Sequence, residues 1–241
     1  MNYLKTIISV LVLLAVISCQ KNQTEGGGQV CFTVSSNEIV ADMTKSKVSE
    51  YTTLPSTEDF SISVSGSGYQ WSGKISDWDE TTVLLAGEYT VTASCGSIDT
   101  EGFDAPYFTG TEDFIITGGE TSSVSIPVSL GNTIVKVSCS DDFKRYYKDY
   151  TFKVTRDGTA IVEFVKDESR AAFVDGYKIS VEGTLTGESK TYTFLKEYTN
   201  LEEATAYTFH FDVSNVGGSS ITIKFNDNVE TIDLGDFELN E

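Results

Sequence analysis

The sequence predicts an all-β protein with two tandem antiparallel β-sandwich domains of the immunoglobulin or transthyretin type. Three observations support this fold class. Apolar residues alternate with polar residues at a period of two in almost every ordered segment, which is typical of half-buried strands. Breaks that contain glycine or aspartate separate these segments at the spacing of hairpins. The same order of segments also occurs twice along the chain.

The alternating segments are expected to form strands because a strand directs successive side chains to opposite faces of its sheet. They cover residues 30–34, 60–64, 89–93, 114–116, 124–128, 134–137, 152–154, 179–181, 207–211 and 221–225. The breaks fall at residues 66–68, 118–119, 157–158, 175–176 and 217–218. Short helical turns are expected at residues 142–150 and 201–206, and no segment shows a long helical stripe.

An internal repeat relates the two halves of the chain. Residues 59–64 match residues 149–154, and residues 87–92 resemble residues 176–181 at nearly the same offset. Two matched strand types in the same order favour two related sandwiches in tandem.

The junction between the predicted domains is placed at Gly131, between the end of one strand and the start of the next. The N-terminal domain then covers residues 30–130 and the C-terminal domain covers residues 131–241. Tyr89 and Tyr207 each follow an aliphatic residue by six positions. This spacing indicates a tyrosine corner, in which the phenol hydroxyl ties a loop to the next strand.

The N-terminus carries the signal of an exported, lipid-anchored protein. Lys5 precedes an apolar run at residues 7–16 that is too short to span a bilayer as a mature helix. The run ends at Cys19, with an aliphatic residue three positions earlier and a small residue just before it, which resembles the lipobox of bacterial lipoproteins. Residues 1–18 are therefore predicted to be a signal peptide, and residues 19–29 an acylated cysteine with a flexible tether. The alternative is an ordinary secretory signal that happens to end near a cysteine.

Composition excludes some partners. The chain has a formal net charge of −19. Such an acidic surface repels nucleic acid and anionic lipid headgroups, so no nucleic-acid partner is expected. Aromatic residues make up 12% of the chain and only three prolines occur, which argues against a disordered stalk.

The cysteines and the histidine do not form a recognisable catalytic or metal set. With Cys19 acylated, Cys31, Cys95 and Cys139 remain, and an odd number cannot pair completely within one chain. We favour no intrachain disulfide. His210 is the single histidine, so the usual zinc ligand sets are not available, and no cofactor motif occurs. A glycosidase-like enzyme with paired carboxylates stays open as an alternative, because such pairs come from distant strands.

Two aromatic clusters are candidates for binding. Trp71 and Trp78 could offer rings on which sugars stack, although buried tryptophans are normal core elements of sandwiches. The second cluster lies in a loop too long for a tight hairpin turn. There Tyr107 and Phe108 are expected to stay partly exposed and to form, with Asp104, a contact for a protein subunit or a glycan. The alternative is that these rings cap the end of the first sandwich.

Several motifs carry a resemblance to a known family. They lie at residues 85–93, 102–110, 131–133 and 143–150. With the signal peptide, they resemble a family of Bacteroidetes lipoproteins of uncharacterised function. More loosely, a lipobox followed by tandem β-domains is similar to fimbrillin-type surface lipoproteins. This resemblance implies an architecture and no activity.

These observations favour a non-enzymatic protein, anchored in the outer membrane through a lipid on Cys19, that acts as a structural or interaction module of the adhesion or fimbria type. Which face of the outer membrane it occupies is left open by the sequence. The first alternative is a glycan-binding accessory protein of polysaccharide uptake, and the second is the glycosidase-like enzyme.

Overall fold

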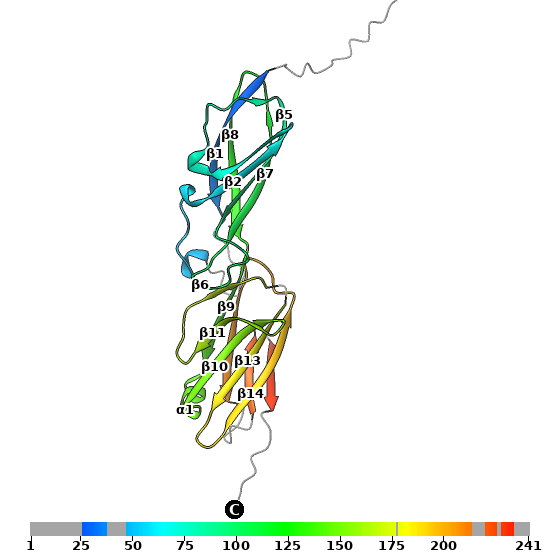
Figure 1. Ribbon diagram of the computed structural model, residues 1–241. Coiled ribbons are helices and arrows are strands. Elements are labelled where there is room, and N and C mark those ends of the chain that lie inside the picture. The colour runs from blue at the N-terminus through cyan, green and yellow to red at the C-terminus, as the bar shows by residue number, and fades with distance from the viewer. Residues whose placement is uncertain (1–25, 38–46, 177, 214–219, 226–227, 234–241) are drawn as a thin grey trace, which may run out of the picture.

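The computed structural model describes residues 26–37, 47–176, 178–213, 220–225 and 228–233 of the 241-residue chain (Figure 1). Strands dominate these residues, so the predicted all-β class is confirmed. The predicted signal peptide, Cys19 and most of the predicted tether lie outside the described residues, as does the turn predicted at residues 217–218. Within the described ranges, no helix is long and apolar enough to cross a membrane.

The strands of the first half are β1 (Gly27–Ser36), β2 (Ser61–Gly66), β3 (Tyr69–Lys74), β4 (Leu84–Leu85), β5 (Gly87–Cys95), β6 (Gly102–Phe103), β7 (Phe108–Ile116) and β8 (Thr121–Leu130). Those of the second half are β9 (Thr133–Cys139), β10 (Asp149–Arg156), β11 (Thr159–Val165), β12 (Ala172–Val174), β13 (Lys178–Thr186), β14 (Thr191–Thr199), β15 (Ala206–Val213), β16 (Ser220–Phe225) and β17 (Asn228–Asp233). The helical elements are α1 (Asp141–Tyr146) and the 3-10 turns η1 (Val48–Glu50), η2 (Thr57–Asp59) and η3 (Ile75–Asp77).

The first half is built on a sheet with the strand order β3-β2-β5-β7-β8-β1-β4. Alternate side chains of these strands are buried, as the period-two pattern predicts. Val30 of β1, Val64 of β2, Val91 of β5 and Ile126 of β8 are each 0% exposed and belong to one hydrophobic cluster. Side chains from the two ends of the strand order thus share a single core.

The second half contains two sheets. One has the order β11-β10-β13-β14, and the other has the order β17-β16-β15-β9-β12-β6. A second hydrophobic cluster includes side chains of both sheets, and aromatic rings are prominent in it. The rings of Phe152 in β10 and Phe211 in β15 stack at 4.0 Å between centroids, which joins the two layers.

The internal repeat is visible in the topology. The order β3-β2-β5-β7 in the first half corresponds to β11-β10-β13-β14 in the second. The matched sequence segments therefore occupy matched central strands. The pairing is mostly antiparallel, as predicted, but β1 pairs with β8 and β9 pairs with β15 in parallel. Parallel partners need a long crossover between them, which the intervening strands of each half supply.

The helix α1 forms where the sequence carries matching end signals. Ser140 precedes it, and its hydroxyl accepts a hydrogen bond from the Phe143 backbone N–H. Asp141 lies in the first turn and Arg145 in the last, which suits the helix dipole. Phe143 is fully buried in the second cluster, so the predicted short helix serves to cover one end of that core.

Both predicted tyrosine corners are confirmed. The Tyr89 hydroxyl donates a hydrogen bond to the Leu85 carbonyl at 3.0 Å. The Tyr207 hydroxyl accepts one from the Glu202 backbone N–H, also at 3.0 Å. Each bond gives the hydroxyl of a buried tyrosine a partner and fixes the loop before a core strand.

The two halves lie end to end, and the molecule is elongated (Figure 1). Strand β6 precedes Gly131 in the sequence but pairs with β12 in a sheet of the second half. In addition, the Ile134 and Phe173 side chains, which follow Gly131, belong to the first hydrophobic cluster. Residues from both sides thus cross the boundary predicted at Gly131, and a division into two domains at that residue stays a prediction.

Candidate functional site at the junction of the two halves

The loop between β5 and β7, residues 97–107, reaches from the first half onto the second. It contains Asp104 and Tyr107, which the sequence singled out as binding candidates, and the short strand β6. We call residues 97–107 the bracket loop. Figure 1 shows β6 beside the second half, below the long strands of the first.

The bracket loop is held on the second half by a charged contact. The Arg156 guanidinium donates two hydrogen bonds of 2.8 Å to the two carboxylate oxygens of Glu101. The Asp175 backbone N–H donates a third bond to the same carboxylate at 2.6 Å. The Glu101 side chain is only 13% exposed and that of Arg156 is 32% exposed. This paired, largely desolvated contact is of the strong, charge-assisted kind.

Strand pairing and ring packing reinforce the charged contact. Gly102 and Phe103 pair with Phe173 and Ala172 at the edge of the second half's larger sheet. The Phe103 ring meets the Phe164 ring edge to face at 5.1 Å between centroids. The bracket loop thus adds a strand to one sheet and a ring to the second core.

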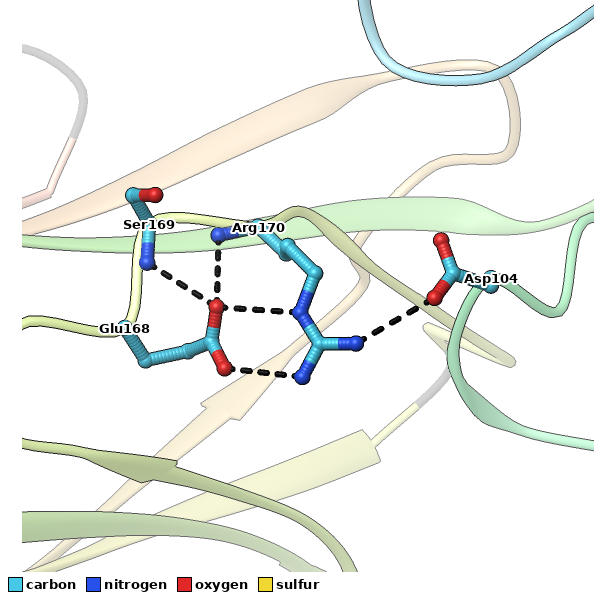
Figure 2. A network of polar contacts seen from close by, with 4 residues as sticks. All are labelled: Asp104, Glu168, Ser169 and Arg170. Carbon is cyan, nitrogen blue, oxygen red and sulfur yellow. Dashed lines mark hydrogen bonds and ion pairs between the residues drawn. The ribbon is translucent and has the colours of Figure 1, made fainter.

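A polar network closes the outer side of the bracket loop (Figure 2). The Arg170 guanidinium donates to both carboxylate oxygens of Glu168 and, at 3.2 Å, to the Asp104 carboxylate. It also lies over the Phe103 ring, 4.2 Å from the centroid. The hydrogen bonds from the Arg170 side chain and backbone lower the pKa of Glu168 to about 2. Glu168 is therefore ionised at neutral pH and orients Arg170 toward Asp104.

Tyr107 contacts residues at the junction of the two halves. Its backbone N–H donates to the Asn132 side-chain oxygen, and its carbonyl accepts from the Gly131 N–H at 2.7 Å. The half-buried ring packs against Gly131, where a Cβ atom would lie 2.8 Å from Tyr107 Cδ1. Only glycine permits this close approach of ring and backbone. Tyr107 is thus partly exposed, as predicted, while its backbone and part of its ring are used at the junction.

The structure corrects two other candidates. Phe108 is 1% exposed and belongs to the first cluster, so the prediction that its ring stays partly exposed is wrong. Trp78 is 8% exposed, and its indole N–H donates to the Val30 carbonyl at 2.9 Å. Trp71 is half-buried and meets Trp78 edge to face. Trp78 lies in the first hydrophobic cluster and Trp71 packs against it, because burial against apolar side chains removes the large apolar area of each ring from water.

Asp104 lies in a groove beside the junction. The groove has a volume of about 880 Å³ and is lined by Ser49, Tyr51, Thr52, Thr53, Leu54, Asp104 and Pro106. We call it the junction groove. The Asp104 side chain is 82% exposed, and its backbone has a φ of 55°, a left-handed conformation that aspartate tolerates better than most residues. The Lys136 ammonium of the second half lies 5.7 Å from the centroid of the Tyr51 ring, so one lining residue of the groove also contacts the second half.

The chemistry of the junction groove is that of a polar contact surface. An aromatic ring, a carboxylate and several hydroxyls could meet a sugar or a polar peptide. In the described part of the chain, no cluster of three or more His, Cys, Asp or Glu side chains is placed to hold a metal ion. Cys31, Cys95 and Cys139 are free thiols in the structure.

The sequence did not single out Glu101, Arg156, Arg170 or Tyr51. One signal was available, because the chain contains only three arginines, and two of them, Arg156 and Arg170, lie at this junction. Arginine is the residue that binds carboxylates through two parallel hydrogen bonds. Its rarity in so acidic a chain could have marked both positions.

Fold and site together define an all-β protein whose two halves are fastened end to end by a bracket loop. The chain belongs to the family described as "Domain of unknown function (DUF4493)", whose family model matches residues 26–239. The resemblance to a family of uncharacterised function is thereby confirmed. Among curated proteins, none matches the chain.

Solved structures that match the chain include proteins of Bacteroides and Parabacteroides. A "fimbrial assembly protein" of Parabacteroides distasonis is 6% identical with a TM-score of 0.47, and the match covers 87% of this chain and 99% of that one. A "putative cell adhesion protein" of Bacteroides ovatus is 11% identical with a TM-score of 0.43, covering 88% and 99%. One of the "putative polysaccharide binding proteins (DUF1812)" of Bacteroides thetaiotaomicron is 11% identical with a TM-score of 0.42, covering 87% and 99%.

Proposed function

We propose that this protein is a non-enzymatic interaction module of the cell envelope, of the adhesion or fimbria type, anchored in the outer membrane by acylation of Cys19. In this proposal the chain presents two sandwich domains as one extended body. The junction groove, with Asp104 at its rim, is the surface that contacts a protein subunit or a glycan.

The observation that carries the proposal is the bracket loop. Domains joined by a single linker are expected to move relative to each other unless their interface is extensive. Here the halves are joined by the Glu101–Arg156 pair, by the β6–β12 pairing and by the Phe103–Phe164 contact. These contacts favour a fixed, elongated shape, which suits a protein that holds a contact surface away from its anchor.

A site-specific crosslinking experiment tests the groove. A photo-crosslinking amino acid at Thr53, inside the junction groove, is compared with one at Ser125, an exposed position of β8 that does not line it. We expect one defined crosslinked product from Thr53 on intact cells, and its loss when Asp104→Ala is added. Equal products from both positions, or a product that survives Asp104→Ala, would refute the groove as the contact surface.

Glycan binding at the same groove is the second candidate function. Tyr51 is half-buried, so part of its ring is open to a sugar, and threonine and serine hydroxyls surround it. A glycan array probed with the purified protein separates the candidates. Binding that depends on Tyr51 supports polysaccharide capture, whereas crosslinking to a protein subunit supports assembly.

A further inference from the structure

A second cavity lies at the far end of the molecule from the start of β1. There α1 and the turn between β13 and β14 meet (Figure 1). The Lys148 backbone N–H, just after α1, donates to the Thr186 carbonyl at the end of β13 at 2.8 Å, which holds the two segments together. The turn itself is closed by a bond from the Gly187 N–H to the Lys190 carbonyl at 2.9 Å. We call this cavity the end pocket.

The end pocket has aromatic walls in fixed positions. It has a volume of about 290 Å³, and the rings of Tyr146 and Tyr192 line it. Tyr146 is half-buried and meets the fully buried Tyr147 edge to face at 5.0 Å between centroids. Tyr147 in turn meets Tyr192 edge to face at 6.4 Å. Because a buried ring supports both walls, Tyr146 can offer an open ring surface at little cost in conformational entropy.

The charge of the end pocket is opposite to that of the whole protein. Arg145 and Lys190 line it, with Glu188 as the single acid among the lining residues. The Arg145 guanidinium is paired with the Asp142 carboxylate, so Lys190 is the lining cation that supplies the local positive charge. The Glu188 carboxylate lies 3.9 Å from the Lys148 ammonium, so a further cation offsets it. The Lys190 ammonium stands over the Tyr192 ring, 5.2 Å from the centroid. A locally cationic pocket on a chain of net charge −19 favours an anionic ligand over a neutral one.

We propose that the end pocket binds a saccharide unit that carries a carboxylate, such as a uronic acid residue. The Tyr146 ring packs against the sugar ring, and Lys190 faces its carboxylate. The volume lies at the lower end of the range for small-molecule sites, roughly 300–1,000 Å³, which suits one sugar ring better than a long chain segment. This proposal goes beyond the proposed function, because its site shares no lining residue with the junction groove.

Solution binding measurements test the proposal on the mature protein. The probes are a uronic-acid disaccharide and the neutral disaccharide of the same linkage, measured by calorimetry at low and at physiological salt. We expect at least tenfold weaker binding of the neutral probe, and weaker binding of the acidic probe at higher salt, because exposed charges are screened. Tyr146→Ala should weaken both probes about tenfold, whereas Lys190→Gln should weaken only the acidic one.

The matched control is Lys224→Gln, which removes an exposed lysine of β16 that does not line the end pocket. It should leave the binding of both probes unchanged. Three outcomes overturn the proposal: no binding of the acidic probe at millimolar concentration, equal binding of both probes, or the same loss from Lys224→Gln as from Lys190→Gln. Binding of an acidic peptide in place of the sugar would likewise overturn it. The crosslinking result at the junction groove is independent of these measurements, so either proposal can fail alone.

Discussion

Replacing Glu101 by glutamine removes the charge that holds the bracket loop on the second half. The carboxylate accepts two bonds from Arg156 and one from the Asp175 N–H, and glutamine keeps the shape of the side chain but replaces one acceptor oxygen by a donor. The new amide then points N–H groups at an arginine that has no acceptor. Arg156 stays partly desolvated without its counter-charge.

The expected loss follows from the exposure of the two side chains. Fully exposed ion pairs contribute about 0–1 kcal/mol. Breaking a buried pair costs about 3–5 kcal/mol, because one charge is left uncompensated. With Glu101 at 13% and Arg156 at 32% exposure, the pair lies between these limits but nearer the buried one. We expect Glu101→Gln to lower the free energy of unfolding by about 2–3 kcal/mol.

Urea unfolding of the mature protein, with a double-mutant cycle, measures this effect. Glu101→Gln, Arg156→Met and the double variant should show a coupling free energy of about 1.5–2 kcal/mol. The exposed pair Lys178–Glu197, at 3.5 Å with exposures of 46% and 60%, provides the control. Glu197→Gln should cost about 0.5 kcal/mol or less. A coupling free energy between Glu101 and Arg156 of about 0.5 kcal/mol or less, the size expected for an exposed pair, would refute the bracket loop as a strong contact between the halves.

The remaining predictions concern anchoring, domain division, the bracket loop and pH. Cys19→Ala should abolish labelling by a fatty acid, and continued labelling would remove the lipoprotein interpretation. A fragment of residues 133–241 should unfold cooperatively but at a lower temperature than the intact protein, because it lacks β6; an insoluble or molten fragment would mean that the halves share one core. Tyr107→Ala should cost about 2 kcal/mol through its lost packing, whereas Asp104→Ala, at 82% side-chain exposure, should change the unfolding free energy by about 0.5 kcal/mol or less; equal losses in urea unfolding would contradict these two placements. The pKa of Glu168 is lowered to about 2, so its contribution to stability is complete above the unfolded value near 4.5 and is lost as the pH falls through about 2; an NMR titration midpoint near 4.5 would contradict the Arg170 network.

Structural features that depend on residues close together in the chain were predictable from the sequence. Tyr89 and Tyr207 were assigned to corners because the spacing of an aliphatic residue and a tyrosine is enough to place the hydroxyl near its own loop. A short helical turn was expected at residues 142–150, and α1 covers the first part of that range, whereas the turn expected at residues 201–206 forms no helix. The strands at residues 89–93 and 124–128 were predicted because apolar and polar residues alternate in them, and the burial of their side chains alternates in the same way.

The candidate site was predicted less well, because exposure depends on contacts that are distant in sequence. Asp104 was expected at the surface, and it lies there. Phe108 was expected to be partly exposed, yet it is the first residue of β7 and pairs with Leu130 and Cys95 over the first core. The sequence of a loop with aromatic and acidic residues does not show whether its rings are exposed to a ligand or buried against a neighbouring core.

The sequence by itself determined the all-β class, the breaks between strands at residues 66–68, 118–119, 157–158 and 175–176, the repeat of strand types and the membership of a family of uncharacterised function. These features depend on residues a few positions apart, and a period of two reports which face of a strand is buried. Only the tertiary structure decided which strands pair and what the bracket loop contacts. Glu101 and Arg156 are 55 residues apart, and alternation along one strand carries no information about its partner across such a distance. The packing of two layers around each core decides three features that the sequence does not show. These are the parallel pairing of β1 with β8, the pairing of β6 with the second half, and the meeting of Tyr146 and Lys190 in one pocket.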